Sequence, residues 1–268
     1  MLKLSAVYAI APEVDFDVVI RGSFENILKY MRKLGYNGIE LNIANPFKID
    51  LAYLRKTVEL HGMEVSAIST GLSYLSYGYS LSSLNEDNRR RALEFFRKYI
   101  DISIDLGARK VVVGLARGRC SRKEHDKAME RLIDSLGELD DYAGKRGSLI
   151  VLEPLNRYET NLINKLSEAL KIVKTLKNTK ILFDTFHIML EERDVYDALN
   201  IAGSYIGHVH FADSNRLAPG MGMLDWERIV FRLIRTGYRG FVSIEARAEP
   251  SLEILLETAI KTLRPFLL

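Results

Sequence analysis

Residues 206–245 read IGHVHFADSNRLAPGMGMLDWERIVFRLIRTGYRGFVSIE, and this segment carries the clearest signal of the chain's architecture. The short apolar run at 206–211 predicts a strand, and Asp225 can cap a helix that opens at Trp226. Glycines then precede a second apolar run at 241–245. Because glycine tolerates the left-handed conformation, it commonly ends a helix before a strand. The stretch therefore predicts one strand–helix–strand unit.

The same alternation of short apolar runs and longer amphipathic segments extends over the whole chain. Eight units in 268 residues correspond to about 33 residues each, which is the size of a unit in a parallel barrel. We therefore predict an α/β fold, a single (β/α)8 TIM barrel that spans residues 1–268 as one domain. The expected strands are Lys3–Tyr8, Gly38–Ile43, Glu64–Ser69, Lys110–Leu115, Leu149–Glu153, Ile181–Asp184, Ile206–Phe211 and Phe241–Glu245.

An open, doubly wound sheet is the alternative fold. It normally carries a glycine-rich phosphate-binding turn after its first strand. Residues 9–13 occupy that position and read Ala-Ile-Ala-Pro-Glu, without glycine. The sequence therefore favours the barrel.

Composition excludes several classes of protein. Hydrophobic residues make up 47% and charged residues 27%, as in soluble globular proteins, and no apolar run is long enough to span a membrane. The net charge of +3 is spread without a long basic block, so we expect neither a nucleic-acid nor a membrane partner. The single cysteine, Cys120, cannot form an intrachain disulfide, which favours a cytoplasmic protein.

The balance of residue types also suggests adaptation to heat. Glutamine is absent, whereas lysine, arginine and glutamate are plentiful. The composition therefore predicts a thermophile protein that melts above about 60 °C, beyond the usual mesophile range.

Each of the last four expected strands ends in a residue that can bind a hard metal ion. These residues are Glu153, Asp184, His210 and Glu245, and each is about one βα unit from the next. Adjacent barrel strands would deliver all four to the C-terminal mouth, where barrel enzymes have their active sites. Any one of them alone could be a polar residue facing solvent, but four in consecutive units favour a shared site.

Three carboxylates that converge inside a barrel repel one another unless a cation lies between them. Three carboxylates and one imidazole make an oxygen-rich site, which suits Mn²⁺ or Mg²⁺, with Co²⁺ or Zn²⁺ as alternatives. We therefore predict one divalent metal ion, with manganese preferred. Such an ion can keep open positions for two substrate oxygens.

Further polar residues follow the expected strands. Arg117 and Arg119 follow the fourth strand, where they could bind a carboxylate or phosphate through paired hydrogen bonds or simply lie in a solvated loop. His208 lies two residues before His210 and so faces the same side at a deeper level, which indicates a buried, hydrogen-bonded histidine. We interpret Glu40, on the second strand, as structural.

Segments 152–159, 183–187, 208–216 and 240–245 resemble the D-tagatose 3-epimerase branch of the xylose-isomerase-like barrel superfamily. Segments 38–41 and 219–226 also fit this pattern, so the resemblance covers the whole chain and is most specific in its second half. The loop at 117–119 is more basic than expected of free-ketose enzymes.

The resemblance implies roles for individual residues. Glu153, Asp184, His210 and Glu245 would hold one divalent metal, and the two glutamates would be the catalytic acid and base. Substrate oxygens would be bound by Glu159, His187 and Arg216. The resemblance also implies a homo-oligomer, either a dimer or a tetramer.

These residues together predict a carbohydrate epimerase. One glutamate would remove the proton next to a ketone, the metal would stabilise the resulting cis-enediolate, and the other glutamate would protonate the opposite face. The inverted carbon would be of the C3 type. The arginines Arg117 and Arg119 suggest that the sugar is a keto-sugar acid, such as a hexulosonate, as an alternative to a neutral ketose.

Three other functions remain open. A sugar isomerase, such as a hydroxypyruvate isomerase, or an inosose dehydratase could use the same metal and glutamates. A DNA-repair nuclease of the endonuclease IV type would need more histidines than residues 69–71 and 115–117 provide at the third and fourth strand ends. A sugar-binding protein without catalysis would not need both Glu153 and Glu245.

Overall fold

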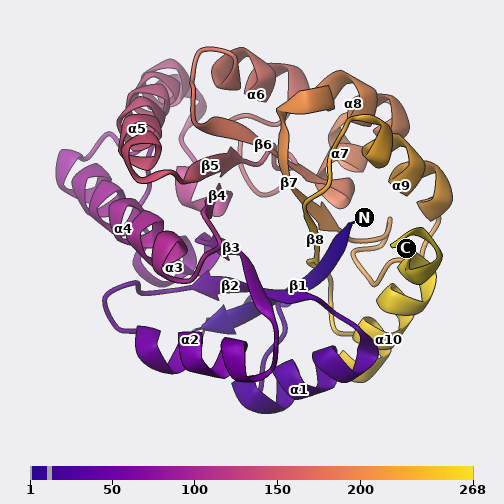
Figure 1. Ribbon diagram of the computed structural model, residues 1–268. Coiled ribbons are helices and arrows are strands. Elements are labelled where there is room, and N and C mark those ends of the chain that lie inside the picture. The colour runs from indigo at the N-terminus through magenta and orange to yellow at the C-terminus, as the bar shows by residue number, and fades with distance from the viewer. Residues whose placement is uncertain (1, 11–13, 268) are drawn as a thin grey trace.

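The computed structural model describes residues 2–10 and 14–267. Residues 11–13, part of the segment without a glycine-rich turn, lie outside the described residues. Eight parallel strands form a closed barrel in chain order, which confirms the predicted (β/α)8 TIM barrel (Figure 1). The strands are β1 Lys3–Ile10, β2 Gly38–Ile43, β3 Glu64–Ser69, β4 Lys110–Val113, β5 Leu149–Leu152, β6 Thr179–Asp184, β7 Ile206–Phe211 and β8 Phe241–Ile244.

Helices surround the barrel on its outer side (Figure 1). The last helix packs beside the first, and the Tyr36 hydroxyl donates a hydrogen bond to the backbone oxygen of Leu256 at 3.0 Å. The helices are α1 Phe24–Leu34, α2 Leu51–Leu60, α3 Gly71–Tyr77, α4 Glu86–Asp105, α5 His125–Arg146, α6 Leu166–Val173, α7 Thr185–Glu191, α8 Val195–Ala202, α9 Trp226–Arg235 and α10 Leu252–Leu263.

Local sequence explains where the helices begin and end. The Asp225 carboxylate accepts a hydrogen bond from the backbone nitrogen of Arg228, so it caps α9 as predicted. Helix α1 buries an apolar face and ends at Gly35, whose φ of 103° lies in the left-handed region. Helix α1 thus leads directly into β2, and α9 into β8.

The strand ends meet at one rim of the barrel. Asp184 is paired with His210 in the register of β6 and β7, and the backbone nitrogen of Glu245 donates to the carbonyl oxygen of Phe211. Glu153 directly follows β5. The closed register thus places the candidate metal ligands at neighbouring positions around the C-terminal mouth.

The layer of side chains just below this rim is divided into two halves. Because side chains alternate along a strand, the residues two positions earlier also face the interior. On β5 and β6 these residues are Val151 and Leu182, which belong to an apolar cluster. On β7 and β8 they are His208 and Ser243, both fully buried. The interior is therefore apolar under one side of the rim and polar under the other.

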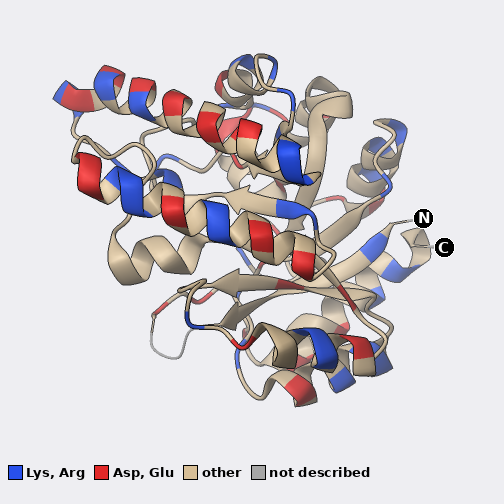
Figure 2. Ribbon diagram, turned by 60° about the vertical axis from the view of Figure 1, so that its left-hand side comes forward, with Lys and Arg blue, Asp and Glu red and all other residues tan. Residues whose placement is uncertain are grey.

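Charges of both signs lie on the outer helices (Figure 2). On α4, Arg90 forms ion pairs with Asp87 and Glu94, and Arg97 pairs with Glu138 of α5. None of the helices in the described parts of the chain is long and apolar enough to cross a membrane.

Candidate active site

The structure brings Glu153, Asp184, His210 and Glu245 together at the barrel mouth. The Nδ1 atom of His210 lies 3.6 Å from Oε1 of Glu153, 3.9 Å from Oδ2 of Asp184 and 3.5 Å from Oε2 of Glu245. All four side chains are buried. One small volume therefore contains three carboxylates and one imidazole nitrogen.

Local structure fixes the direction of these carboxylates. Asp184 is the N-cap of α7, where its Oδ1 accepts hydrogen bonds from the backbone nitrogens of Phe186 and His187, at 2.7 and 3.2 Å. Its Oδ2 remains directed at the cluster. Glu153 packs against Gly114, and a Cβ atom at Gly114 would lie only 2.7 Å from Oε2 of Glu153. Glycine at this position makes room for the carboxylate.

Two atoms of the cluster have no hydrogen-bond partner. They are Oε1 of Glu153 and Nδ1 of His210, both buried and facing each other. Burying polar atoms without partners costs free energy, and a divalent cation between them would satisfy both. The donor set, with three carboxylates and one imidazole, also matches the ligands that hard divalent ions prefer. These residues therefore fit a metal ion.

The electrostatic environment separates the pKa values of the acidic groups. Burial raises the pKa of Glu153, and the charge of Glu245 adds to the shift. Burial alone would raise the pKa of Asp184, but the charges of Arg216 and the two neighbouring histidines lower it to about 2. Burial is likewise outweighed at Glu245, where His210 and Arg216 lower the pKa. The two candidate catalytic glutamates therefore have pKa values shifted in opposite directions.

Arg216 bridges two of the carboxylates. Its Nη1 donates to Oδ2 of Asp184 at 2.9 Å, and its Nη2 donates to Oε2 of Glu245 at 2.6 Å. The guanidinium also lies over the ring of Phe186, 4.8 Å from the centroid. Its backbone has a φ of 63°, in the left-handed region, and its carbonyl accepts a hydrogen bond from the backbone nitrogen of Arg247. The loop thus holds this arginine at the mouth.

His187 presents an N–H group to the cluster. The Oδ1 of Asn156 accepts from the backbone nitrogen of Tyr158, so its Nδ2 is a donor, and it donates to Nδ1 of His187 at 2.8 Å. The remaining nitrogen, Nε2, then carries the hydrogen in the neutral ring and lies 3.9 Å from Oε1 of Glu153. Asn156 also donates to Glu159, at 2.9 Å. His187 is therefore arranged as a hydrogen-bond donor to a ligand.

The structure corrects the interpretation of Arg117. Its side chain is fully buried, and burial lowers its pKa to about 10. All five N–H groups of the guanidinium donate to the backbone, so none is left to bind a substrate. The acceptors are the carbonyl oxygens of Val113, Gly114, Glu153, Leu162 and Ile163.

Arg119 lies on the surface of the same loop and is exposed. A pocket opens over the cluster, and its described lining includes neither Arg117 nor Arg119. The one cationic side chain in this described lining is Arg216, beside Glu153, Glu159 and Glu245. The basic loop at 117–119 therefore does not make the pocket positively charged.

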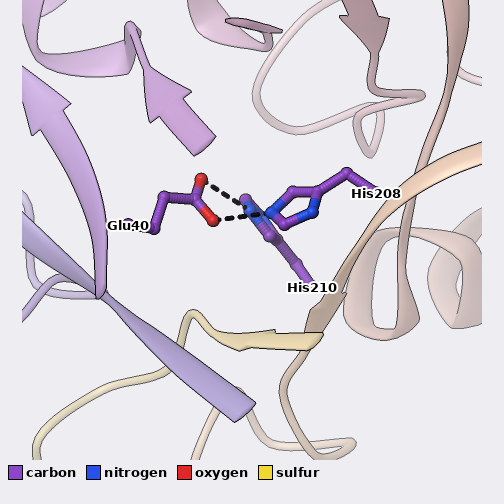
Figure 3. A group of neighbouring side chains, drawn as sticks. All are labelled: Glu40, His208 and His210. Carbon is purple, nitrogen blue, oxygen red and sulfur yellow. Dashed lines mark hydrogen bonds and ion pairs between the residues drawn. The ribbon is translucent and has the colours of Figure 1, made fainter. Parts of the chain in front are cut away.

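Glu40 forms a hydrogen bond with His210 of the site, whereas the sequence indicated only a structural role. It reaches across the barrel interior to two histidines of β7 (Figure 3). His208 is buried and hydrogen-bonded, as predicted. Burial alone would raise the pKa of Glu40, but His210 and His208 hold it well below its usual value. The one signal in the sequence was a carboxylate inside the otherwise uncharged segment 38–43.

Comparison with known proteins agrees with this geometry. A family model described as xylose isomerase-like TIM barrel matches residues 28–266. The chain is 29% identical over 239 residues to a 3-dehydro-D-guloside 4-epimerase of Escherichia coli, covering 83% of this chain and 88% of that protein. It is 30% identical over 237 residues to a D-psicose 3-epimerase of Ruminiclostridium cellulolyticum, covering 83% and 78%.

Solved structures extend the similarity over nearly the whole chain. An L-ribulose 3-epimerase superposes with a TM-score of 0.83 at 25% identity, covering 100% of this chain and 95% of the other. An AP endonuclease of family 2 from Brucella melitensis superposes at 0.78 with 19% identity, covering 99% of each chain, and so shares the fold. The curated relatives support an epimerase or isomerase, as the sequence predicted. The chain belongs to the xylose isomerase-like TIM barrel family.

Proposed function

We propose that this protein is a metal-dependent epimerase that inverts carbon 3 of a ketose. The observation that carries the proposal is the convergence of Glu153 and Glu245 on Asp184 and His210, around two buried atoms without partners. Curated relatives with 3-epimerase names give the proposal further support.

Glu153, Asp184, His210 and Glu245 would hold the metal, for which we favour Mn²⁺ over Mg²⁺, Co²⁺ or Zn²⁺. A bound divalent cation would polarise the ketone and stabilise the negative charge that develops when the neighbouring C–H loses its proton. Glu153 and Glu245 come from β5 and β8 and so approach a sugar from different directions. One carboxylate takes the proton from one face of the carbon, and the other carboxyl group delivers a proton to the opposite face.

Three further residues would orient the sugar. His187 donates its Nε2–H to a substrate oxygen, and Arg216 donates from a guanidinium that Asp184 and Glu245 hold in place. Glu159, which Asn156 positions, accepts a hydrogen bond from a sugar hydroxyl. These contacts would hold the reacting carbon between the two glutamates.

The pocket favours a neutral ketose over a keto-sugar acid. In the sequence, Arg117 and Arg119 suggest an acidic substrate, but all N–H groups of the Arg117 guanidinium donate to backbone carbonyls. The positive charge of Arg216 is compensated by ion pairs with two carboxylates, those of Asp184 and Glu245. A carboxylate on the substrate would therefore gain no free cation within the described lining of this pocket.

A 4-epimerase acting on a 3-keto sugar is the second candidate. The observation in its favour is the match to the Escherichia coli 3-dehydro-D-guloside 4-epimerase, which this chain covers to 88% of its length. Both reactions invert a carbon that adjoins a ketone, so the same pair of glutamates could serve either substrate.

NMR in D₂O with Mn²⁺-loaded enzyme tests the proposal. The samples are psicose, fructose, tagatose, ribulose, a hexulosonate and a 3-keto-glycoside, with readout after the metal and protein are removed. We expect deuterium at carbon 3 of a neutral ketose together with its 3-epimer. An aldose product would indicate an isomerase, and a product that has lost water would indicate a dehydratase. In a separate assay, nicking of abasic DNA would indicate a nuclease. Any of these without epimer formation contradicts the proposal.

A further inference from the structure

A buried polar group lies directly below the proposed metal site. Glu40 of β2 is fully buried and contacts two histidines of β7 (Figure 3). Its Oε2 lies 2.7 Å from Nε2 of His208, and its Oε1 lies 3.0 Å from Nε2 of His210. The hydroxyl of Ser69 also donates to Oε1 of Glu40. Both oxygens of this carboxylate are therefore hydrogen-bonded.

We propose that Glu40 is a positioning residue, which fixes the tautomer and ring orientation of His210 so that Nδ1 offers its lone pair to the metal. His208 holds Glu40 in place from the same strand. This inference rests on the metal site of the proposed function.

The tautomer follows from the chemistry of the contacts. An ionised carboxylate only accepts hydrogen bonds, so the ring nitrogens that face Glu40 must carry hydrogen. A metal-bound imidazole is neutral and has one N–H group, and in metal-bound His210 that group would be at Nε2. Its Nδ1, which lacks a hydrogen-bond partner and faces Glu153, Asp184 and Glu245, would then offer its lone pair to the metal. A histidine that binds a metal usually donates its other N–H to such an acceptor.

The surroundings make this arrangement rigid. The rings of His208 and His210 are 5.4 Å apart between centroids and inclined by 80°, so each approaches a different oxygen of Glu40. The Nε2 atom of His208 also lies 3.4 Å from the hydroxyl of Ser243, whose oxygen is 2.6 Å from that of Ser5. In the closed barrel, β8 and β1 lie between β7 and β2. Glu40 therefore orients His210 from across the interior.

Glu40, His208 and His210 could also be read as ligands of a second cation, because their donor atoms lie within 4.8 Å of one another. The contacts argue against this reading. Distances of 2.7 and 3.0 Å are those of direct hydrogen bonds between Glu40 and the two histidines. A second ion would have to replace these hydrogen bonds.

The variant Glu40→Gln tests the role of the carboxylate. The two rings approach different oxygens of Glu40, and in glutamine one of these positions is an NH₂ group, which would face an Nε2–H group without accepting from it. We expect one Mn²⁺ per wild-type chain by calorimetry, and a dissociation constant about 10- to 100-fold higher for Glu40→Gln. The control is Ser103→Ala, which removes a buried hydrogen bond of 3.0 Å to Ser148. Thermal unfolding in EDTA shows whether both variants are folded.

Long-range ¹H–¹⁵N NMR of the imidazole rings provides a readout that a purely structural role would not change. In the Zn²⁺-loaded wild type, we expect hydrogen at Nε2 of both His208 and His210 and none at Nδ1 of His210. Glu40→Gln should show a second tautomer or a disordered signal for His210. Because the wild-type spectrum alone reveals the tautomer, the test does not depend on folding of the variant.

The outcomes separate this inference from the proposed function. The positioning role is overturned if wild type and Glu40→Gln each bind one ion with equal affinity. It is also overturned if the hydrogen of His210 is found at Nδ1. Either result leaves the metal site intact. Two ions per wild-type chain also overturn the positioning role, because the second would occupy Glu40 and His208. A wild-type chain that binds no ion overturns both proposals.

Discussion

At the scale of single residues, the two glutamates of the site differ in their environment. Burial raises the pKa of Glu153, whereas His210 and Arg216 outweigh burial and lower that of Glu245. Enzymes that use two carboxyl groups in different protonation states commonly separate them in this way. Their convergence from β5 and β8 is what the proposed epimerase requires and a simple sugar-binding site does not.

Glu153→Gln and Glu245→Gln should each reduce kcat by at least about 100-fold, because an amide cannot exchange the proton that inverts the carbon. Steady-state kinetics with the ketose identified by NMR, in parallel with the Mn²⁺ content of each variant, provides the measurement. Circular dichroism should show an unchanged fold. Near-normal turnover by either variant would refute its role as acid or base.

Arg117→Lys should destabilise the protein without a specific effect on substrate binding. A lysine cannot reach all five carbonyl oxygens, and each buried carbonyl left without a partner costs about 1–3 kcal/mol. Thermal unfolding should show a clear loss of stability, whereas Arg119→Ala, on the exposed part of the loop, should leave the midpoint unchanged. A stable Arg117→Lys protein with a raised KM would instead restore the substrate-binding role.

At the scale of elements, the loop from β7 to α9 connects the site to the outer helices. Asp213 organises this loop, since its Oδ1 accepts from the backbone of Leu224 and its Oδ2 accepts from the backbone of Gly220 and from Nε1 of Trp226. Its own carbonyl accepts from the backbone nitrogen of Arg216. One buried aspartate therefore joins the two ends of the loop, because its carboxylate holds the segment that leads into α9 and its backbone carbonyl holds the backbone of Arg216.

Asp213→Ala should raise KM by about tenfold or more, equivalent to about 1.4 kcal/mol of lost binding, because the loop that carries Arg216 would lose the hydrogen bonds of the Asp213 carboxylate to Gly220, Leu224 and Trp226. The matched control is Asp225→Ala, which removes the N-cap of α9 and should cost about 0.5–2 kcal/mol of stability without raising KM. Kinetics and thermal unfolding of both variants are compared. Equal KM values in the two variants would show that Asp213 stabilises the helix only.

At the scale of the whole molecule, the barrel brings together groups that are distant along the chain. Glu40 and His210 are separated by 170 residues yet hydrogen-bonded. Because the proposed metal ligands come from four strands, an ion bound there would link one half of the barrel. Occupancy of the site should therefore affect global stability.

Mn²⁺ at about 100 times its dissociation constant should stabilise the folded protein by about 2.7 kcal/mol, because the unfolded chain cannot assemble the four ligands. For a chain of this size that corresponds to a rise of about 5–10 °C in the unfolding midpoint. Differential scanning calorimetry with Mn²⁺ or EDTA measures it, and His210→Ala should abolish the rise. Identical midpoints for the wild type under both conditions would exclude a metal bound with useful affinity.

The sequence alone determined the barrel and the set of residues at its mouth. Alternating strand and helix patterns are local, and each of Glu153, Asp184, His210 and Glu245 lies within one residue of the end of its strand, so their common rim could be derived from unit length. The cap at Asp225 was predictable for the same reason, because a helix N-cap involves only neighbouring residues.

Only the tertiary structure decided the roles of Arg117 and Glu40. The acceptors of Arg117 include the carbonyls of Leu162 and Ile163, about one βα unit away, and nothing local indicates that the guanidinium turns inward. Glu40 finds its partners across the barrel, and which side chains meet there depends on closure of the sheet. Contacts between distant segments depend on how strands are arranged in space, and the pattern of a single strand does not contain that information.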